Sequence, residues 1–298
     1  MYHNPVLLKE SVEGLVNNPN GIYVDLTFGG GGHSAAILER LSSKGKLIAF
    51  DIDGDAVKNH IRDERFILVN QNFRFLWNYL RYYDAIPVDG ILADLGVSSH
   101  QIDADERGFS IRKDGDLDMR MNMGLSVSAK DVVNTYSAER LIEIFRDYGE
   151  LEKPHVLAHA IVKQREIKAF ETTGELRAFA ERFAPKKKEY KYLSQLFQSV
   201  RIEVNQEIDA LEELLLQLEK VLKSGGIAAI ISYHSLEDRL VKNLFKTGNL
   251  EGELKKDFYG NKLSPFVLAN RKPILPSEKE IEENGRARSA KLRIAEKI

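Results

Sequence analysis

The chain has 298 residues, with 43 Lys and Arg against 45 Asp and Glu, a formal net charge of −2, and no cysteine. Hydrophobic residues make up 43% and charged residues 30%, which is the composition of an ordinary soluble globular protein with a sizeable core. The absence of cysteine excludes a disulfide framework, a thiolate metal site and a cysteine nucleophile. The near-neutral charge argues against a general nucleic-acid binder, although a local basic face stays possible.

No targeting signal is visible in the sequence. Residues 1–10 lack the basic segment followed by an apolar run that marks a signal peptide. No window approaches 18 uninterrupted apolar residues, so we expect no membrane span. The expected location is the cytoplasm.

Short apolar runs alternate with helical patterns along the first hundred residues. This spacing predicts βαβ units and a parallel sheet. The predicted strands are 21–27, 46–51, 65–69 and 88–94, and the predicted helices are 33–41 and 55–61.

The alternation then breaks and later resumes. Residues 98–124 are too polar for a strand, and 128–198 read as several amphipathic helices. A predicted helix at 205–222 ends at Gly225-Gly226, and another at 235–246 has Ser235 as its N-cap. Further strands are expected at 226–233, 265–269 and 289–295. The prediction is an α/β, Rossmann-like sheet built from 1–104 and 205–298, interrupted by a helical insertion at 105–204.

Four glycines follow the first predicted strand, within Asp25-Leu-Thr-Phe-Gly-Gly-Gly-Gly-His-Ser34. Such a loop lets the backbone approach a ligand, and the next helix points its amides at an anionic group. The nicotinamide fingerprint G-x-G-x-x-G needs a glycine where Thr27 stands or, if it begins at Gly29, where Ser34 stands. No Walker loop is present. The pattern acid-x-x-x-Gly-x-Gly, formed by Asp25, Gly29 and Gly31, resembles the first motif of S-adenosylmethionine-dependent methyltransferases. The alternative is a tight turn without a ligand.

Three further residues stand at predicted strand ends. Asp51 ends the second strand, 22 residues after Gly29, where an acid can accept both ribose hydroxyls. Phe73 follows the third strand and is either part of an adenine pocket or a core aromatic. Asp94 ends the fourth strand, where ligands and reacting atoms lie in open α/β sheets. For Asp51 the alternative is a helix cap or a solvated acid.

A set of longer motifs carries a family resemblance. These are His3-x-Pro5-Val-Leu-Leu, the Asp25–Ser34 loop, Asp94-Leu-Gly-Val-Ser-Ser-x-Gln101, Glu106-Arg-Gly-Phe-Ser110, Leu117-Asp-Met-Arg-Met121, Phe197-Gln-x-Val-Arg-Ile202, Ser235-Leu-Glu-Asp-Arg239 and Arg286-Ala-Arg-Ser289. Together they resemble the bacterial 16S ribosomal RNA cytosine-N4 methyltransferase family, from near residue 3 to near residue 296.

The resemblance implies a function and a cofactor. The cofactor would be S-adenosyl-L-methionine, and the substrate the exocyclic N4 amine of a cytidine in the decoding region of 16S rRNA, within the small ribosomal subunit. The sheet would then be the methyltransferase domain and the insertion would recognise substrate. The implied cofactor contacts are Gly31, Gly32, His33, Asp51, Phe73, Asp94 and Gln101.

Methyl transfer to a cytosine amine needs a proton acceptor beside a poorly nucleophilic nitrogen. Asp94 is the first candidate and Asp118 the second, although Asp118 could equally form an ion pair with Arg120 or Arg107. His234, which ends the fifth strand, is a candidate for substrate contact, but lone histidines are more often structural. No metal-ligand spacing occurs, and transfer from a sulfonium needs no metal.

RNA contact is expected from two short basic segments, residues 182–191 and 286–298. An isolated cluster of this kind is more often solvated, and Arg201, Arg286 and Arg288 gain support only from the family motifs. A monomer and a homodimer both stay open. Two other functions also stay open: a nicotinamide oxidoreductase, and a non-catalytic RNA-binding assembly factor that keeps a nucleotide pocket.

The missing cysteine bears on the choice of target atom. Methylation at cytosine C5 ordinarily needs a cysteine thiolate that adds to C6. A chain without cysteine cannot form that adduct, so transfer to the N4 amine is the consistent chemistry.

Overall fold

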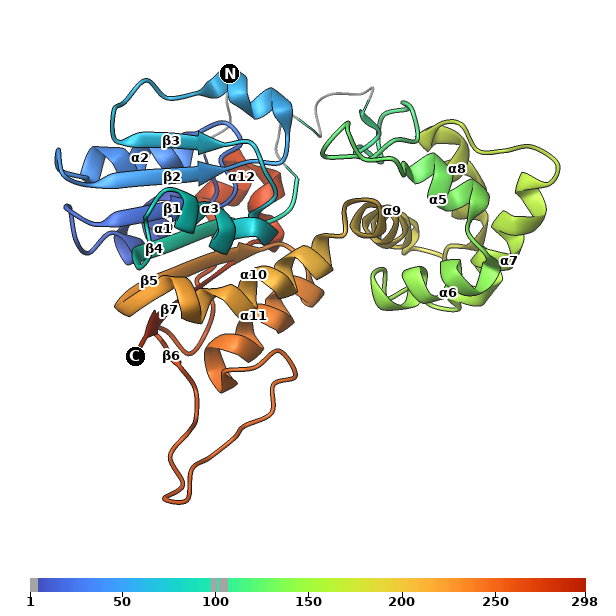
Figure 1. Ribbon diagram of the computed structural model, residues 1–298. Coiled ribbons are helices and arrows are strands. Elements are labelled where there is room, and N and C mark those ends of the chain that lie inside the picture. Colours follow the sequence, from blue (N-terminus) through green and yellow to red (C-terminus); the bar gives the residue numbers. More distant parts are fainter. Residues whose placement is uncertain (1–4, 98–100, 102–106) are drawn as a thin grey trace. The chain divides into compact units, whose positions relative to one another are not determined.

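The computed structural model describes residues 5–97, 101 and 107–298, and within them seven strands form one sheet (Figure 1). The strand order is β3-β2-β1-β4-β5-β7-β6. Neighbouring strands are parallel except at β7, which runs antiparallel to both β5 and β6. The strands are β1 Ile22–Asp25, β2 Lys46–Phe50, β3 Phe66–Val69, β4 Val88–Asp94, β5 Leu222–Ser232, β6 Phe266–Leu268 and β7 Lys291–Lys297. The predicted Rossmann-like α/β sheet is confirmed.

The chain divides into two compact units, one formed by residues 1–96 with 208–298 and the other by residues 97–207. The predicted boundary at 104/105 lies outside the described residues, as do the motif residues His3, Ser98, Ser99 and Glu106. The assignment of one unit to methyl transfer and of the other to substrate recognition stays a prediction.

Helices cover both faces of the sheet because successive strand residues point to opposite sides. In β4, Ile91 and Ala93 pack into a core with α3, α10 and α11, whereas Leu92 packs into a second core with α1 and α2. The helices of this unit are α1 Leu8–Leu15, α2 Gly32–Arg40, α3 Leu76–Tyr82, α10 Glu207–Val221, α11 Ser235–Thr247 and α12 Glu278–Glu283, with 3-10 helices η1 Gly54–Asn59, η2 Phe73–Phe75 and η5 Gly285–Ser289.

The other unit is helical and has a core of its own. Buried side chains such as Phe145, Leu196 and Val200 pack together there without any strand of the sheet. Its helices are α5 Ala129–Thr135, α6 Ala138–Asp147, α7 Pro154–Arg165, α8 Thr173–Ala180 and α9 Glu189–Asn205, with the 3-10 helix η4 Glu181–Phe183. Among the described residues, no helix is long and apolar enough to cross a membrane.

The predicted end of one helix and the predicted type of another are wrong. Helix α10 ends at Val221 and the chain enters β5 at once, so Gly225 and Gly226 lie within the strand. The register between β4 and β5 shifts there, and Gly225, at φ 76°, takes the left-handed backbone that such an irregularity needs. The predicted helix at 55–61 is instead the 3-10 helix η1.

Candidate active site

The carboxyl ends of β1, β2, β3 and β4 bring the candidate ligand-binding residues of this unit to one edge of the sheet. The connection after β1 leads to β2 on one side, and the connection after β3 crosses to β4 on the other. Ligands of open α/β sheets bind outside the carboxyl ends of the strands at such a switch point. Asp25 ends β1, Asp51 directly follows β2, and Asp94 ends β4.

The glycine loop takes a backbone that other residues would strain. Gly29 has φ 52° and Gly31 has φ 79°, both in the left-handed region. A Cβ on Gly31 would lie 3.0 Å from the Phe28 ring, and one on Gly32 would lie 2.2 Å from Pro5 Cγ. A Cβ on Gly29 would meet only the Thr27 carbonyl at 3.9 Å, so the loop leaves open space at this position.

Asp25 fixes the loop to the first turn of α2. Its fully buried carboxylate accepts hydrogen bonds from the Ser34 hydroxyl at 2.7 Å and from the Thr27 amide at 3.1 Å. Burial raises the pKa of Asp25, and the bonds from Ser34 and Thr27 partly offset that rise. Asp25 therefore ties the residues before and after the four glycines together and has a structural role in the loop.

Ser34→Ala is expected to lower the free energy of unfolding by about 1–3 kcal/mol, because it removes a donor from a buried carboxylate. Chemical denaturation at neutral pH measures this loss. The matched control is Ser11→Ala: the Ser11 hydroxyl is also fully buried but has no hydrogen-bond partner in the described part of the chain. Equal effects of the two variants would contradict the role assigned to Ser34.

Asp51 is held by two backbone amides. Its carboxylate accepts from the Gly29 amide at 2.6 Å and from the Asp53 amide at 2.8 Å, while Asn70 Nδ2 donates to the Asp51 carbonyl at 2.9 Å. Burial raises the pKa of Asp51 to about 6, against the lowering effect of the two amides. Phe73 begins η2 after β3 and is half-buried against the core, which keeps both of its predicted interpretations open.

Asp94 lies among three polar side chains of the same unit. Its amide donates to Thr27 Oγ1 at 2.7 Å, and its Oδ1 accepts from the Tyr233 hydroxyl at 2.8 Å. Its Oδ2 lies 3.9 Å from His33 Nδ1. Burial raises the pKa of Asp94 to about 6, against the lowering effect that a protonated His33 exerts and that of the Tyr233 hydrogen bond. Burial, with Asp94 beside it, raises the pKa of the Tyr233 hydroxyl strongly, so this group remains a donor.

The His33 ring is neutral, and its unprotonated nitrogen lies on the side of Asp94. Burial lowers the pKa of His33, which favours the neutral ring although Asp94 opposes the shift. His33 Nε2 lies 3.2 Å from the Val6 carbonyl, which can only accept, so we assign the ring proton to Nε2. Nδ1 then carries the lone pair of the ring and lies 3.9 Å from Asp94 Oδ2. Both atoms can accept a hydrogen bond from an N–H donor.

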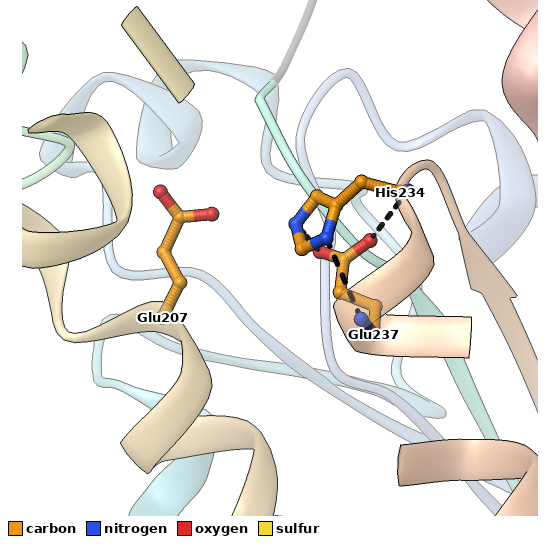
Figure 2. A group of neighbouring side chains, drawn as sticks. All are labelled: Glu207, His234 and Glu237. Carbon is orange, nitrogen blue, oxygen red and sulfur yellow. Dashed lines mark hydrogen bonds and ion pairs between the residues drawn. The ribbon is translucent and has the colours of Figure 1, made fainter. Parts of the chain in front are cut away.

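His234 caps helix α11 (Figure 2). Its Nδ1 accepts from the Glu237 amide at 3.4 Å, while Glu237 Oε2 accepts from the amides of Tyr233 at 2.8 Å and of His234 at 3.4 Å. The predicted N-cap Ser235 is wrong by one residue, because the imidazole accepts the bond that a hydroxyl usually takes. His234 Nε2 lies 3.2 Å from Glu237 Oε1, out of hydrogen-bond alignment. Substrate contact by His234 stays a prediction.

Three predicted site residues belong to the unit formed by residues 97–207. Gln101 is buried, Asp118 accepts from the Arg120 guanidinium at 2.6 Å, and Arg201 makes a bidentate ion pair with Glu207 at 2.9 and 3.0 Å. The Asp118–Arg120 ion pair matches the structural alternative for Asp118. Cofactor contact by Gln101, catalysis by Asp118 and RNA contact by Arg201 stay predictions.

The remaining predicted RNA contacts lie on the short helix η5 of the sheet unit. Arg288 is exposed and Arg286 is half-buried, with its amide bonded to Asn284. Between them, the buried Ala287 anchors η5 to the core.

Sequence reasoning missed Tyr233, Thr27 and Glu280. Tyr233 follows β5 and Thr27 follows β1, and these two strands lie on either side of β4, which Asp94 ends. A prediction of the strand order could therefore have placed both residues beside Asp94. Glu280 of α12 accepts from the Leu7 amide at 2.7 Å and thereby holds the segment that packs on the glycine loop. No local pattern indicates that contact.

Several known proteins are similar to this chain in sequence or in structure. The chain matches the MraW methylase family over residues 1–298. It is 55% identical to ribosomal RNA small subunit methyltransferase H of Parabacteroides distasonis, over 100% of this chain and 98% of the relative. The protein of the same name from Flavobacterium johnsoniae is also 55% identical, with the same coverage. A crystal structure of an rRNA methylase from Streptococcus thermophilus has a TM-score of 0.39 at 14% identity, covering 98% of this chain and 93% of that one. The family resemblance of the motifs is confirmed, and the chain belongs to the MraW methylase family.

Proposed function

We propose that this protein transfers a methyl group from S-adenosyl-L-methionine to the N4 amine of a cytidine in the decoding region of 16S rRNA. The paired acceptors Asp94 Oδ2 and His33 Nδ1 beside the glycine loop are the observation that carries the proposal. The relatives are named as methyltransferases of small-subunit ribosomal RNA, which supports RNA as the substrate. The proposed location is the cytoplasm.

The donor groups at the strand ends fit this cofactor. A carboxylate offers about four lone-pair positions, and backbone amides occupy two of those on Asp51, which leaves room for two ribose hydroxyls. The open face at Gly29 and the first amides of α2 suit the methionine carboxylate. Phe73 would lie against the adenine, and Gly31, Gly32 and Gln101 would complete the contacts.

The chemistry follows from what these residues can accept. When bound, S-adenosylmethionine supplies an electrophilic methyl group on a sulfonium sulfur. Its thioether would be the leaving group, and the amine that gains the methyl group would have to lose one proton. Asp94 Oδ2 and His33 Nδ1 would hold the two N–H groups, which localises the nitrogen lone pair, and ionised Asp94 would take the proton. Tyr233 and Thr27 would fix the orientation of Asp94.

Labelled-methyl transfer to small-subunit particles, followed by nucleoside analysis, tests the proposal. We expect label in N4-methylcytidine. Label in another nucleoside would overturn the target atom. No transfer, with the particle still bound, would instead support the non-catalytic assembly factor. The methylase family of the chain argues against the oxidoreductase alternative.

The Arg286 and Arg288 side chains are proposed to contact RNA phosphates. The double variant R286E/R288E is expected to reduce the slope of log affinity against log salt by about 1–2, because each lost phosphate contact removes nearly one unit. Particle binding between 50 and 200 mM salt measures this slope. The control K44E/R62E makes the same charge change at two exposed residues outside the motifs. An equal change in slope for both variants would refute specific contact by η5.

A further inference from the structure

A hairpin between α11 and β6 is not used by the proposed reaction. It spans residues 255–263, within the long loop that projects from the sheet unit (Figure 1). Lys256 and Lys262 form an antiparallel bridge, and the Leu263 amide donates to the Lys255 carbonyl at 2.9 Å. The segment is therefore paired along its length as well as turned at its tip.

The tip of the 255–263 hairpin is an ordered turn. The Gly260 amide donates to the Asp257 carbonyl at 3.1 Å, and Gly260 has φ 87°, which favours glycine. The Asp257 carboxylate accepts from the amides of Tyr259 and Asn261 at 2.9 and 2.8 Å and from Asn261 Nδ2 at 2.9 Å. The only acid of the hairpin is thus engaged in holding the turn.

Two aromatic side chains are presented by this turn. Phe258 is 98% exposed and Tyr259 is 85% exposed, the highest values among the large apolar side chains of the described residues. Their rings touch edge to face, with centroids 5.6 Å apart, and neither ring belongs to a core cluster. Adjacent aromatic side chains that an ordered turn keeps exposed to solvent indicate a surface that contacts another molecule.

The charges beside the aromatic rings favour a polyanion. Lys255, Lys256 and Lys262 are all exposed, and none has an ion pair within the described part of the chain. Lysine is depleted in the cores of protein–protein interfaces, whereas lysines beside exposed aromatic rings are typical of single-stranded nucleic-acid binding. The aromatic faces can stack on unpaired bases while the ammonium groups contact phosphates.

We propose that the 255–263 hairpin docks on unpaired nucleotides of RNA, with Phe258 and Tyr259 stacking on bases and the three lysines on the flanking phosphates. The proposal rests on RNA being the substrate and adds a second contact surface, outside the glycine-loop site.

The test is binding of the full-length protein to a single-stranded 16S rRNA fragment and, separately, to small-subunit particles, without cofactor. F258A/Y259A is expected to weaken both by about tenfold for each aromatic side chain that stacks on a base, with an unchanged salt slope. K255A/K256A/K262A is expected to reduce the slope of log affinity against log salt concentration by about 2, because three phosphate contacts are lost. F258W/Y259W should retain affinity, because the rings can still stack.

Tyr82→Ala is the matched control, since Tyr82 is 79% exposed and also lies in an edge-to-face pair, with Tyr83. We expect it to bind like the unmodified protein. Unchanged RNA affinity of F258A/Y259A would overturn the proposal, and so would weakened particle binding with normal RNA binding, which would indicate a ribosomal protein instead. Because binding is read without methyl transfer, failure of the hairpin proposal stays distinct from failure of the proposed reaction.

Discussion

Asp94→Asn is expected to slow methyl transfer by about 10²–10⁴-fold, which is the usual contribution of a positioned general base. The amide cannot take the proton, yet it fits the site: its oxygen can still accept from Tyr233 and its nitrogen can donate toward His33 Nδ1. Single-turnover transfer under saturating cofactor and particle measures the loss. Full turnover of a variant that binds both normally would exclude Asp94 as the proton acceptor.

The same substitution is expected to raise the free energy of unfolding at pH 8, by an amount on the order of 1–3 kcal/mol. The folded-state pKa of Asp94 is about 6 against a reference value of 3.8, so the folded protein binds more protons than the unfolded chain between these values. Stability therefore falls as pH rises through that window, and the cost is fully present above pH 6. Chemical denaturation at pH 8 and pH 4 should show the gain at pH 8 only.

Asp89, at the other end of β4, provides the control of opposite sign. Burial acts to raise the pKa of Asp89, but hydrogen bonds from Lys223, Asn18 and the Ile22 amide outweigh it and lower the pKa overall. Asp89→Asn should therefore destabilise the protein at pH 8. If both variants changed stability in the same direction, the burial argument for Asp94 would be wrong.

Asp51→Ala is expected to weaken binding of S-adenosylmethionine by about 10²-fold or more, since hydrogen bonds to a charged group contribute about 1.5–3 kcal/mol each and two ribose hydroxyls are involved. The Gly29 amide also loses its acceptor, which loosens the loop. Calorimetric titration measures the affinity. Asp53→Ala, which removes the cap of η1 but leaves the Asp51 carboxylate in place, should change it by less than about threefold. Equal affinities for the two variants would exclude Asp51 as the ribose ligand.

The sequence predicts the sheet and its acids because those signals are local. Buried strands such as Lys46–Phe50 are short apolar runs between polar turns, and an acid at a strand end is visible wherever the strand is. The Tyr233–Asp94 bond is different. It depends on β4 and β5 being neighbours, with Asp94 opposite Ile231, although a whole helical unit separates them in the chain. The residue pattern of neither strand shows which strand will be its neighbour in the sheet.

The N-cap of α11 and the short helix α3 are hard to predict because the local residue pattern is weak or misleading there. His234 caps α11 because its ring nitrogen reaches the Glu237 amide, a geometry that residue statistics do not favour over Ser235. Helix α3 was not predicted, since Leu76–Tyr82 is only seven residues long and its buried Leu76 and Leu80 make a weak pattern.

The position of the helical unit between β4 and α10 also governs the order in which the protein can fold. During synthesis, β1 to β4 emerge first, but the pairing of β4 with β5 must wait until the chain from Asp94 to Leu222 has been made. The helical unit has its own core of contacts close in sequence and can fold within that interval. Until β5 arrives, one edge of β4 carries unpaired backbone groups. We therefore expect nascent chains that stop before β5 to be the species most prone to aggregate.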